Sequence, residues 1–61
     1  MMRKEEMLQI IDDGRRKADI LRTELDKTQN VEVRNCIKKE LSFLEDNTYR
    51  YVLQAKAYGY I

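Results

Sequence analysis

The sequence predicts an all-α protein: an antiparallel two-helix hairpin that pairs with a second copy into a four-helix bundle. Two long segments, about 3–27 and about 31–58, carry apolar or small residues at alternating intervals of three and four, the period of one helix face. A short polar gap at 28–30 separates them, and so short a connection makes consecutive helices antiparallel neighbours. The sequence has no proline and only two glycines, so few residues would interrupt a long helix. A chain of 61 residues is expected to form a single domain.

The first segment has an apolar seam with a glycine in the middle of the helix. The seam residues are Met7, Ile11, Gly14, Ala18, Leu21 and Leu25. A glycine inside a helix costs about 1 kcal/mol relative to alanine. We therefore expect Gly14 to serve close approach of the second helix, with Leu44 opposite it. A helix break at Asp13-Gly14 is the alternative, although the seam keeps its phase across the glycine.

The second segment has the matching seam and recognisable ends. Its seam residues are Ile37, Leu41, Leu44, Thr48, Tyr51, Ala55 and Tyr58. Asn30 is of the residue type that caps helix N-termini, and Gly59 is the usual residue just after a helix C-terminus. A turn centred near Gln29 would place Gly14 opposite Leu44.

A second apolar surface lies outside the seam, where Ile20, Cys36 and Phe43 share an outer column that antiparallel pairing brings onto one face. A contiguous apolar patch marks an interaction site. A chain of this size buries only about 60% of its unfolded surface, and one cysteine without histidine provides neither an intrachain disulfide nor the usual zinc ligands. We therefore expect these three residues to form a homodimer interface. Coverage by a different protein is the alternative.

Catalytic and metal-binding patterns are absent from the sequence. There is no histidine, no nucleophile elbow and no glycine-rich phosphate loop. The carboxylate pairs at 5–6, 12–13 and 45–46 fall mainly off the seam, unlike the inward-facing ligands of di-metal bundles. We expect no enzyme activity, no catalytic residue, no cofactor and no metal.

The basic residues Arg15, Arg16 and Arg22 are the candidate nucleic-acid contact. Twelve basic and eleven acidic side chains give a net charge of +1, which supplies no general attraction for a nucleic acid. Asp12 also precedes Arg16 by four residues, the favourable order for a helical ion pair. Local pairing is therefore favoured over phosphate binding.

All four tyrosines lie between residues 49 and 60. Tyr51 and Tyr58 fall on the seam, whereas Tyr49, Arg50 and Tyr60 do not. Tyrosine and arginine are enriched in binding hot spots. We expect these last three residues to contact a partner protein.

The function expected from these patterns is that of a non-enzymatic regulator or inhibitor that binds stoichiometrically to a larger protein. Size and class suggest a bacterial or phage origin by analogy. The alternatives are a nucleic-acid-binding regulator that uses the 15–22 face of a dimer and a structural subunit of a helical assembly. No apolar run is long enough for a bilayer, and the N-terminus lacks the apolar core of a signal peptide, so we expect a cytoplasmic protein without a membrane partner.

Overall fold

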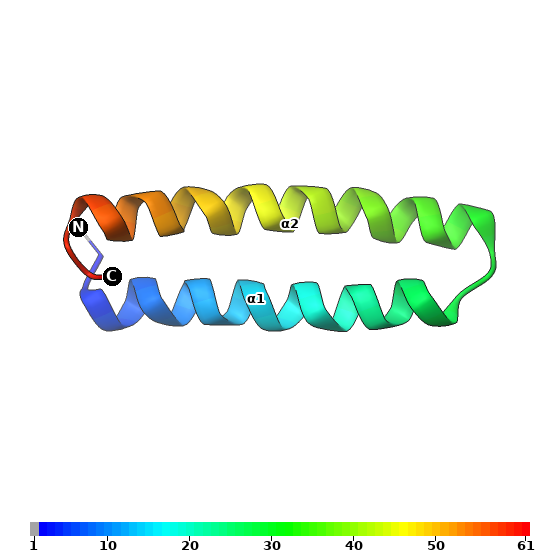
Figure 1. Ribbon diagram of the computed structural model, residues 1–61, viewed down its shortest axis with the longest axis horizontal. Helices are drawn as coiled ribbons and strands as arrows, with labels where there is room; N and C mark the ends of the chain where they lie inside the picture. The colour runs from blue at the N-terminus through cyan, green and yellow to red at the C-terminus, as the bar shows by residue number, and fades with distance from the viewer. Residues whose placement is uncertain (1) are drawn as a thin grey trace.

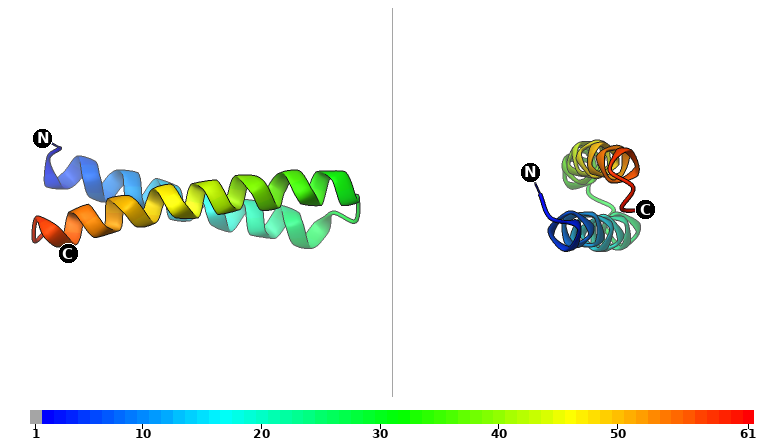
Figure 2. Two further views of the ribbon diagram at one scale, coloured as in Figure 1. Left: turned by 90° about the horizontal axis from the view of Figure 1, so that it is seen from above. Right: turned by 90° about the vertical axis from the view of Figure 1, so that its left-hand side faces the viewer.

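The computed structural model describes residues 2–61 as two long helices packed against each other. Helix α1 spans Lys4–Lys27 and helix α2 spans Val31–Ala57. They run antiparallel, with the linker at one end of the molecule and both chain termini at the other (Figure 1). The predicted all-α hairpin is therefore confirmed. The two helices cross at a shallow angle in the view from above (Figure 2).

Local hydrogen bonds fix the helix ends beside the linker. The Asn30 side chain accepts a hydrogen bond from the Val33 backbone N–H at 3.0 Å, which satisfies one of the free donors at the start of α2. From α2, Arg34 Nη1 donates to the carbonyl oxygen of Leu25 at 2.6 Å and to that of Thr28 at 3.0 Å. Carbonyls at a helix C-terminus lack partners within the helix. Arg34 thus ties the end of α1 to the start of α2.

The chain reverses after α2 and closes the open end of the hairpin. Gly59 has a φ of 75°, the left-handed conformation that glycine adopts without a side-chain clash. Its N–H donates to Lys56 O at 3.1 Å, and the Tyr60 N–H donates to Ala55 O at 2.8 Å, the two bonds of a Schellman motif. The reversal brings the Tyr60 hydroxyl to Met2, whose carbonyl oxygen accepts a 3.2 Å hydrogen bond. The two ends of the chain are therefore in contact.

The core is one narrow seam with two clusters of buried residues. The cluster near the termini contains Met7, Ile11 and Ala55, and the cluster nearer the linker contains Ala18, Ile37 and Leu41. Burial of a large apolar side chain contributes about 1.5–3 kcal/mol. Because the buried residues lie only where the helices touch, the hairpin has little interior beyond this seam.

The register of the seam differs from the expected one by about one helical turn. Thr48, not Leu44, lies opposite Gly14: a Cβ on Gly14 would be 3.2 Å from Thr48 Cγ2 and 3.3 Å from Thr48 Cβ. The expected register placed the centre of the turn near Gln29. Thr28 and Asn30 are extended, with ψ values of 139° and 120°, so the linker continues past α1 before α2 begins. The expected role of Gly14 in close approach is confirmed, with Thr48 as its neighbour.

The hairpin is a rod of 42 × 15 × 14 Å with much exposed surface. Its radius of gyration is 13.8 Å, whereas a compact chain of this length would have about 10.5 Å. Its accessible surface is 4910 Å², against about 4200 Å² for a typical folded monomer of the same mass. Neither α1 nor α2 has the combination of length and apolar character needed to cross a bilayer.

Candidate protein-binding surfaces

An open groove lies on one long flank of the hairpin and is lined by side chains from both helices. Its volume is about 530 Å³. We call it the apolar groove, and it is lined by Lys17, Ile20, Leu21, Lys39, Glu40, Phe43 and Leu44. Ile20 is 58% exposed and Phe43 is 72% exposed. Exposure of two large apolar side chains in one groove is typical of an interaction surface.

The helical repeat explains why these side chains meet outside the core. Leu21 and Leu44 pack against the core cluster near the linker. Ile20 and Phe43 each precede one of these leucines by one residue, so each is rotated by about 100° from the seam. Antiparallel packing brings both onto the same flank. Residues 2–61 form two helices, and no third element among them covers these side chains.

Cys36, the third residue expected on this face, is less closely tied to the groove. Cys36 is exposed and lies two turns before Phe43 on α2, but it is not among the residues that line the groove. Lys17 and Glu40 line the groove from opposite helices. Among residues 2–61, the ion pairs do not include one between Lys17 and Glu40.

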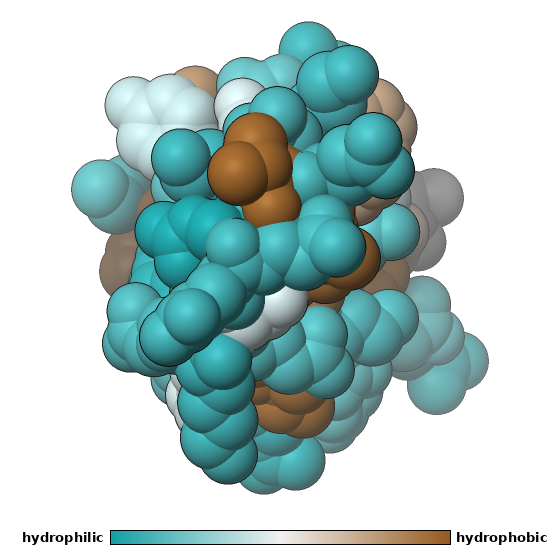
Figure 3. Space-filling view, turned by 90° about the vertical axis from the view of Figure 1, so that its right-hand side faces the viewer, coloured by the Kyte–Doolittle hydropathy of each residue, from teal (hydrophilic) through white to brown (hydrophobic). Residues whose placement is uncertain are grey.

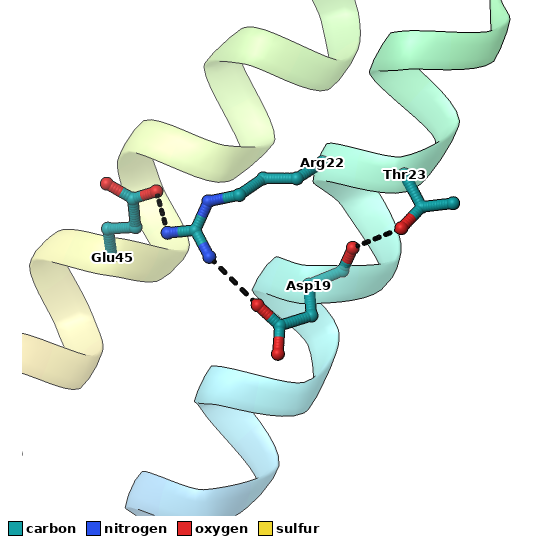
Figure 4. A network of polar contacts seen from close by, with 4 residues as sticks. All are labelled: Asp19, Arg22, Thr23 and Glu45. Carbon is teal, nitrogen blue, oxygen red and sulfur yellow. Dashed lines mark hydrogen bonds and ion pairs between the residues drawn. The ribbon is translucent and has the colours of Figure 1, made fainter.

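A second groove of about 500 Å³, here the arginine groove, includes Gly14, Arg15, Ala18, Asp19, Arg22, Glu45, Thr48, Tyr49 and Val52. Arg22 crosses it from α1 to α2: Nη1 lies 3.0 Å from Asp19 Oδ1, and Nη2 lies 2.7 Å from Glu45 Oε1 (Figure 4). The Thr23 hydroxyl donates to the Asp19 carbonyl oxygen at 3.0 Å. The Arg22 guanidinium is thus shared between two carboxylates on different helices.

The basic cluster on α1 is partly compensated by neighbouring carboxylates. Arg16 Nη2 lies 3.0 Å from Asp12 Oδ2, so the predicted ion pair between these residues is confirmed. Of the three arginines in the candidate nucleic-acid set, Arg15 alone has no ion pair among the described residues, and it lines the arginine groove. Uncompensated cationic charge in this cluster is therefore small.

The tyrosines at the open end have exchanged the roles expected for two of them. Tyr60 packs against the cluster of Met7, Ile11 and Ala55 and donates its hydroxyl to a backbone carbonyl. Tyr58, expected on the seam, is 47% exposed. The chain reversal at Gly59 accounts for the inward position of Tyr60, because the helical period does not continue beyond it.

Tyr49 and Arg50 are exposed residues of α2. Tyr49 lines the arginine groove and is 59% exposed. Arg50 Nη2 lies 3.1 Å from Asp46 Oδ2, an ion pair with both side chains largely in solvent. Of the three candidate partner contacts, Tyr49 is therefore the one whose side chain makes no hydrogen bond or ion pair within the described residues.

The linker end of the rod is mainly hydrophilic. Seen from that end, hydrophobic side chains are small separate areas among charged and polar ones (Figure 3). The apolar groove on the flank is thus a better candidate for a binding surface than the linker end.

No group of three or more histidine, cysteine, aspartate or glutamate side chains within residues 2–61 is arranged to hold a metal ion. Comparison with known proteins returns no match among family models, curated proteins or solved structures. The candidate sites are therefore defined by their own geometry.

Proposed function

We propose that this chain is a non-enzymatic protein-binding regulator that acts stoichiometrically on a larger protein, and that two hairpins pair through the apolar groove into a four-helix bundle. The observation that carries the proposal is the pair of exposed side chains, Ile20 and Phe43, in one groove formed by both helices. Their burial would each contribute about 1.5–3 kcal/mol. A thin rod gains that stabilisation only through association.

The dimer is tested by placing a charge in the groove. Phe43→Glu would bury a carboxylate in each copy, and the two copies would lie close together at a two-fold interface. We expect sedimentation velocity to show a dimer for the parent and a monomer for Phe43→Glu. Leu53→Glu is the matched control, because Leu53 is an exposed apolar residue of α2 that lines neither groove.

Two results would reject the proposed pairing. A parent that sediments as a monomer at high micromolar concentration would remove the dimer altogether. A dimer that withstands Phe43→Glu but dissociates on Leu53→Glu would place the interface on a different face.

The surface proposed for the larger partner is the arginine groove around Tyr49. Pairing through the apolar groove leaves this opposite flank in solvent, and each dimer would present two copies of it. Tyr49 offers a large aromatic surface with few rotatable bonds, the kind of residue that dominates binding energies. A protein is favoured over a nucleic acid because Arg16 and Arg22 are already paired with carboxylates.

Affinity capture from the native host tests this second surface. The parent is compared with Tyr49→Ser and with Tyr58→Ser, a control at an exposed tyrosine outside the arginine groove. We expect one protein to be retained in stoichiometric amount by the parent and the control, and lost with Tyr49→Ser. Equal retention by all three baits would contradict the assignment. Capture of nuclease-sensitive material would favour the nucleic-acid alternative.

A further inference from the structure

We propose that the second copy lies antiparallel on the apolar groove, with each helix packed against the same helix of the other copy. The two-fold axis would pass beside Ile20 of α1 and Phe43 of α2. This inference rests on the proposed dimer and adds its arrangement. It is carried by the order of charges on the flank and by the observed register.

Along the flank of α1 the charged residues are ordered so that, in an antiparallel second copy, each would face a residue of opposite charge. The exposed residues in order are Asp13, Lys17, Ile20, Glu24 and Lys27. Reversal about Ile20 places Lys17 opposite the Glu24 of the other copy, and Asp13 opposite its Lys27. Every charged residue in this series then faces the opposite sign, which favours a second copy over an unrelated surface.

A similar order surrounds Phe43 on α2. Lys39 precedes Phe43 by four residues and Asp46 follows it by three, and all three line one shallow depression. Reversal about this point brings Asp46 of one copy near both Lys39 and Glu40 of the other at the rim of the interface, so the charges match less fully on α2 than on α1. Opposite charges on a rim add little affinity but help to fix the register.

The points about which the two helices are reversed, Ile20 on α1 and Phe43 on α2, lie at the same height along the rod. Gly14 is level with Thr48. Six residues further along α1 lies Ile20, and six residues back along α2 lies Ser42, the neighbour of Phe43. One two-fold axis perpendicular to the rod can therefore serve both helices. In the register expected from the sequence, these two points would be about one helical turn apart.

The area of the flank limits the size of such a dimer interface. A face of 42 by 15 Å corresponds to about 630 Å². Specific interfaces bury roughly 600–1000 Å² on each partner. Ile20 is the seventeenth of the 24 residues in α1, so reversal about it leaves the first turns of α1 uncovered, and the second copy covers less than the whole flank.

Exchange of charges between copies tests the arrangement. In Lys17→Glu homodimers, both contacts between positions 17 and 24 join like charges, and the same is true of Glu24→Lys homodimers. We expect about a tenfold weaker dimer for each variant alone. An equimolar mixture should form the heterodimer at close to parental strength, because both contacts then join opposite charges. One isotope-labelled variant lets native mass spectrometry distinguish the heterodimer.

The matched controls are Lys38→Glu and Asp26→Lys, which make the same charge changes at exposed residues about 140° from Phe43 and about 120° from Ile20 around their helices, away from this flank. They should not weaken the dimer. If the first two variants weaken it and their mixture does not recover, the copies are not antiparallel, although the dimer stands. Weakening by the controls to the same extent would overturn the choice of flank. A monomeric parent would overturn the proposed dimer itself.

Discussion

The closest approach of the two helices provides the sharpest test of the core. Gly14 is buried on α1, and a Cβ added to it would overlap Thr48 Oγ1. Rotation of the Thr48 side chain about χ1 does not remove the conflict. Its Cβ, which that rotation cannot move, is 3.3 Å away and its Cγ2 is 3.2 Å away. The helices would have to separate by several tenths of an ångström.

For Gly14→Ala, two effects of opposite sign compete. Alanine gains about 1 kcal/mol of helix propensity over glycine, whereas overpacking in a close-packed core costs about 1–3 kcal/mol. We expect overpacking to win, with a net loss of up to about 2 kcal/mol. For a chain of 61 residues, each kcal/mol corresponds to about 8 °C in Tm.

A double-mutant cycle with Thr48→Ala identifies the contact responsible. This second change removes Oγ1 and Cγ2, the two side-chain atoms beyond Cβ that a residue at position 14 would meet. Unfolding in urea, followed by circular dichroism at one fixed protein concentration, gives the free energies. Gly14→Ala should destabilise the parent by more than it destabilises the Thr48→Ala variant, in which only the 3.3 Å approach to Cβ remains. Equal effects in both backgrounds, or a stabilised Gly14→Ala single variant, would refute the close-approach argument.

Two further predictions concern the ends of the hairpin. Arg34→Met removes the hydrogen bonds to the carbonyls of Leu25 and Thr28 and should lower the free energy of unfolding by about 1.5–3 kcal/mol. Thermal unfolding measures this loss, and an unchanged Tm would show that Arg34 does not cap α1. Tyr60→Phe removes only the hydrogen bond to Met2 and should cost at most about 1 kcal/mol. Tyr60→Ala also uncovers the core cluster near the termini, so it should cost about 2 kcal/mol and speed hydrogen exchange near the start of α1. Equal losses of stability for Tyr60→Phe and Tyr60→Ala would contradict this packing role.

Much of the candidate site follows from the helical period, and the rest depends on contacts between the helices. Ile20 and Phe43 were expected on one face because both precede seam residues, and they share the apolar groove. The bridge from Arg22 to Glu45 was not expected, because it needs the observed register. The inward position of Tyr60 was missed because it lies beyond the chain reversal, where the helical period ends.

The sequence alone determined that this chain forms two long helices, that the second begins after Asn30 and ends before Gly59, and which residues form each seam except Tyr58, whose expected inward place Tyr60 takes. Those features depend on local propensity, capping and the helical period, all of which are properties of neighbouring residues. Only the tertiary structure decided how far one helix slides along the other. That offset depends on the extended linker and on Thr48 fitting against Gly14, and it sets the height at which Ile20 and Phe43 meet.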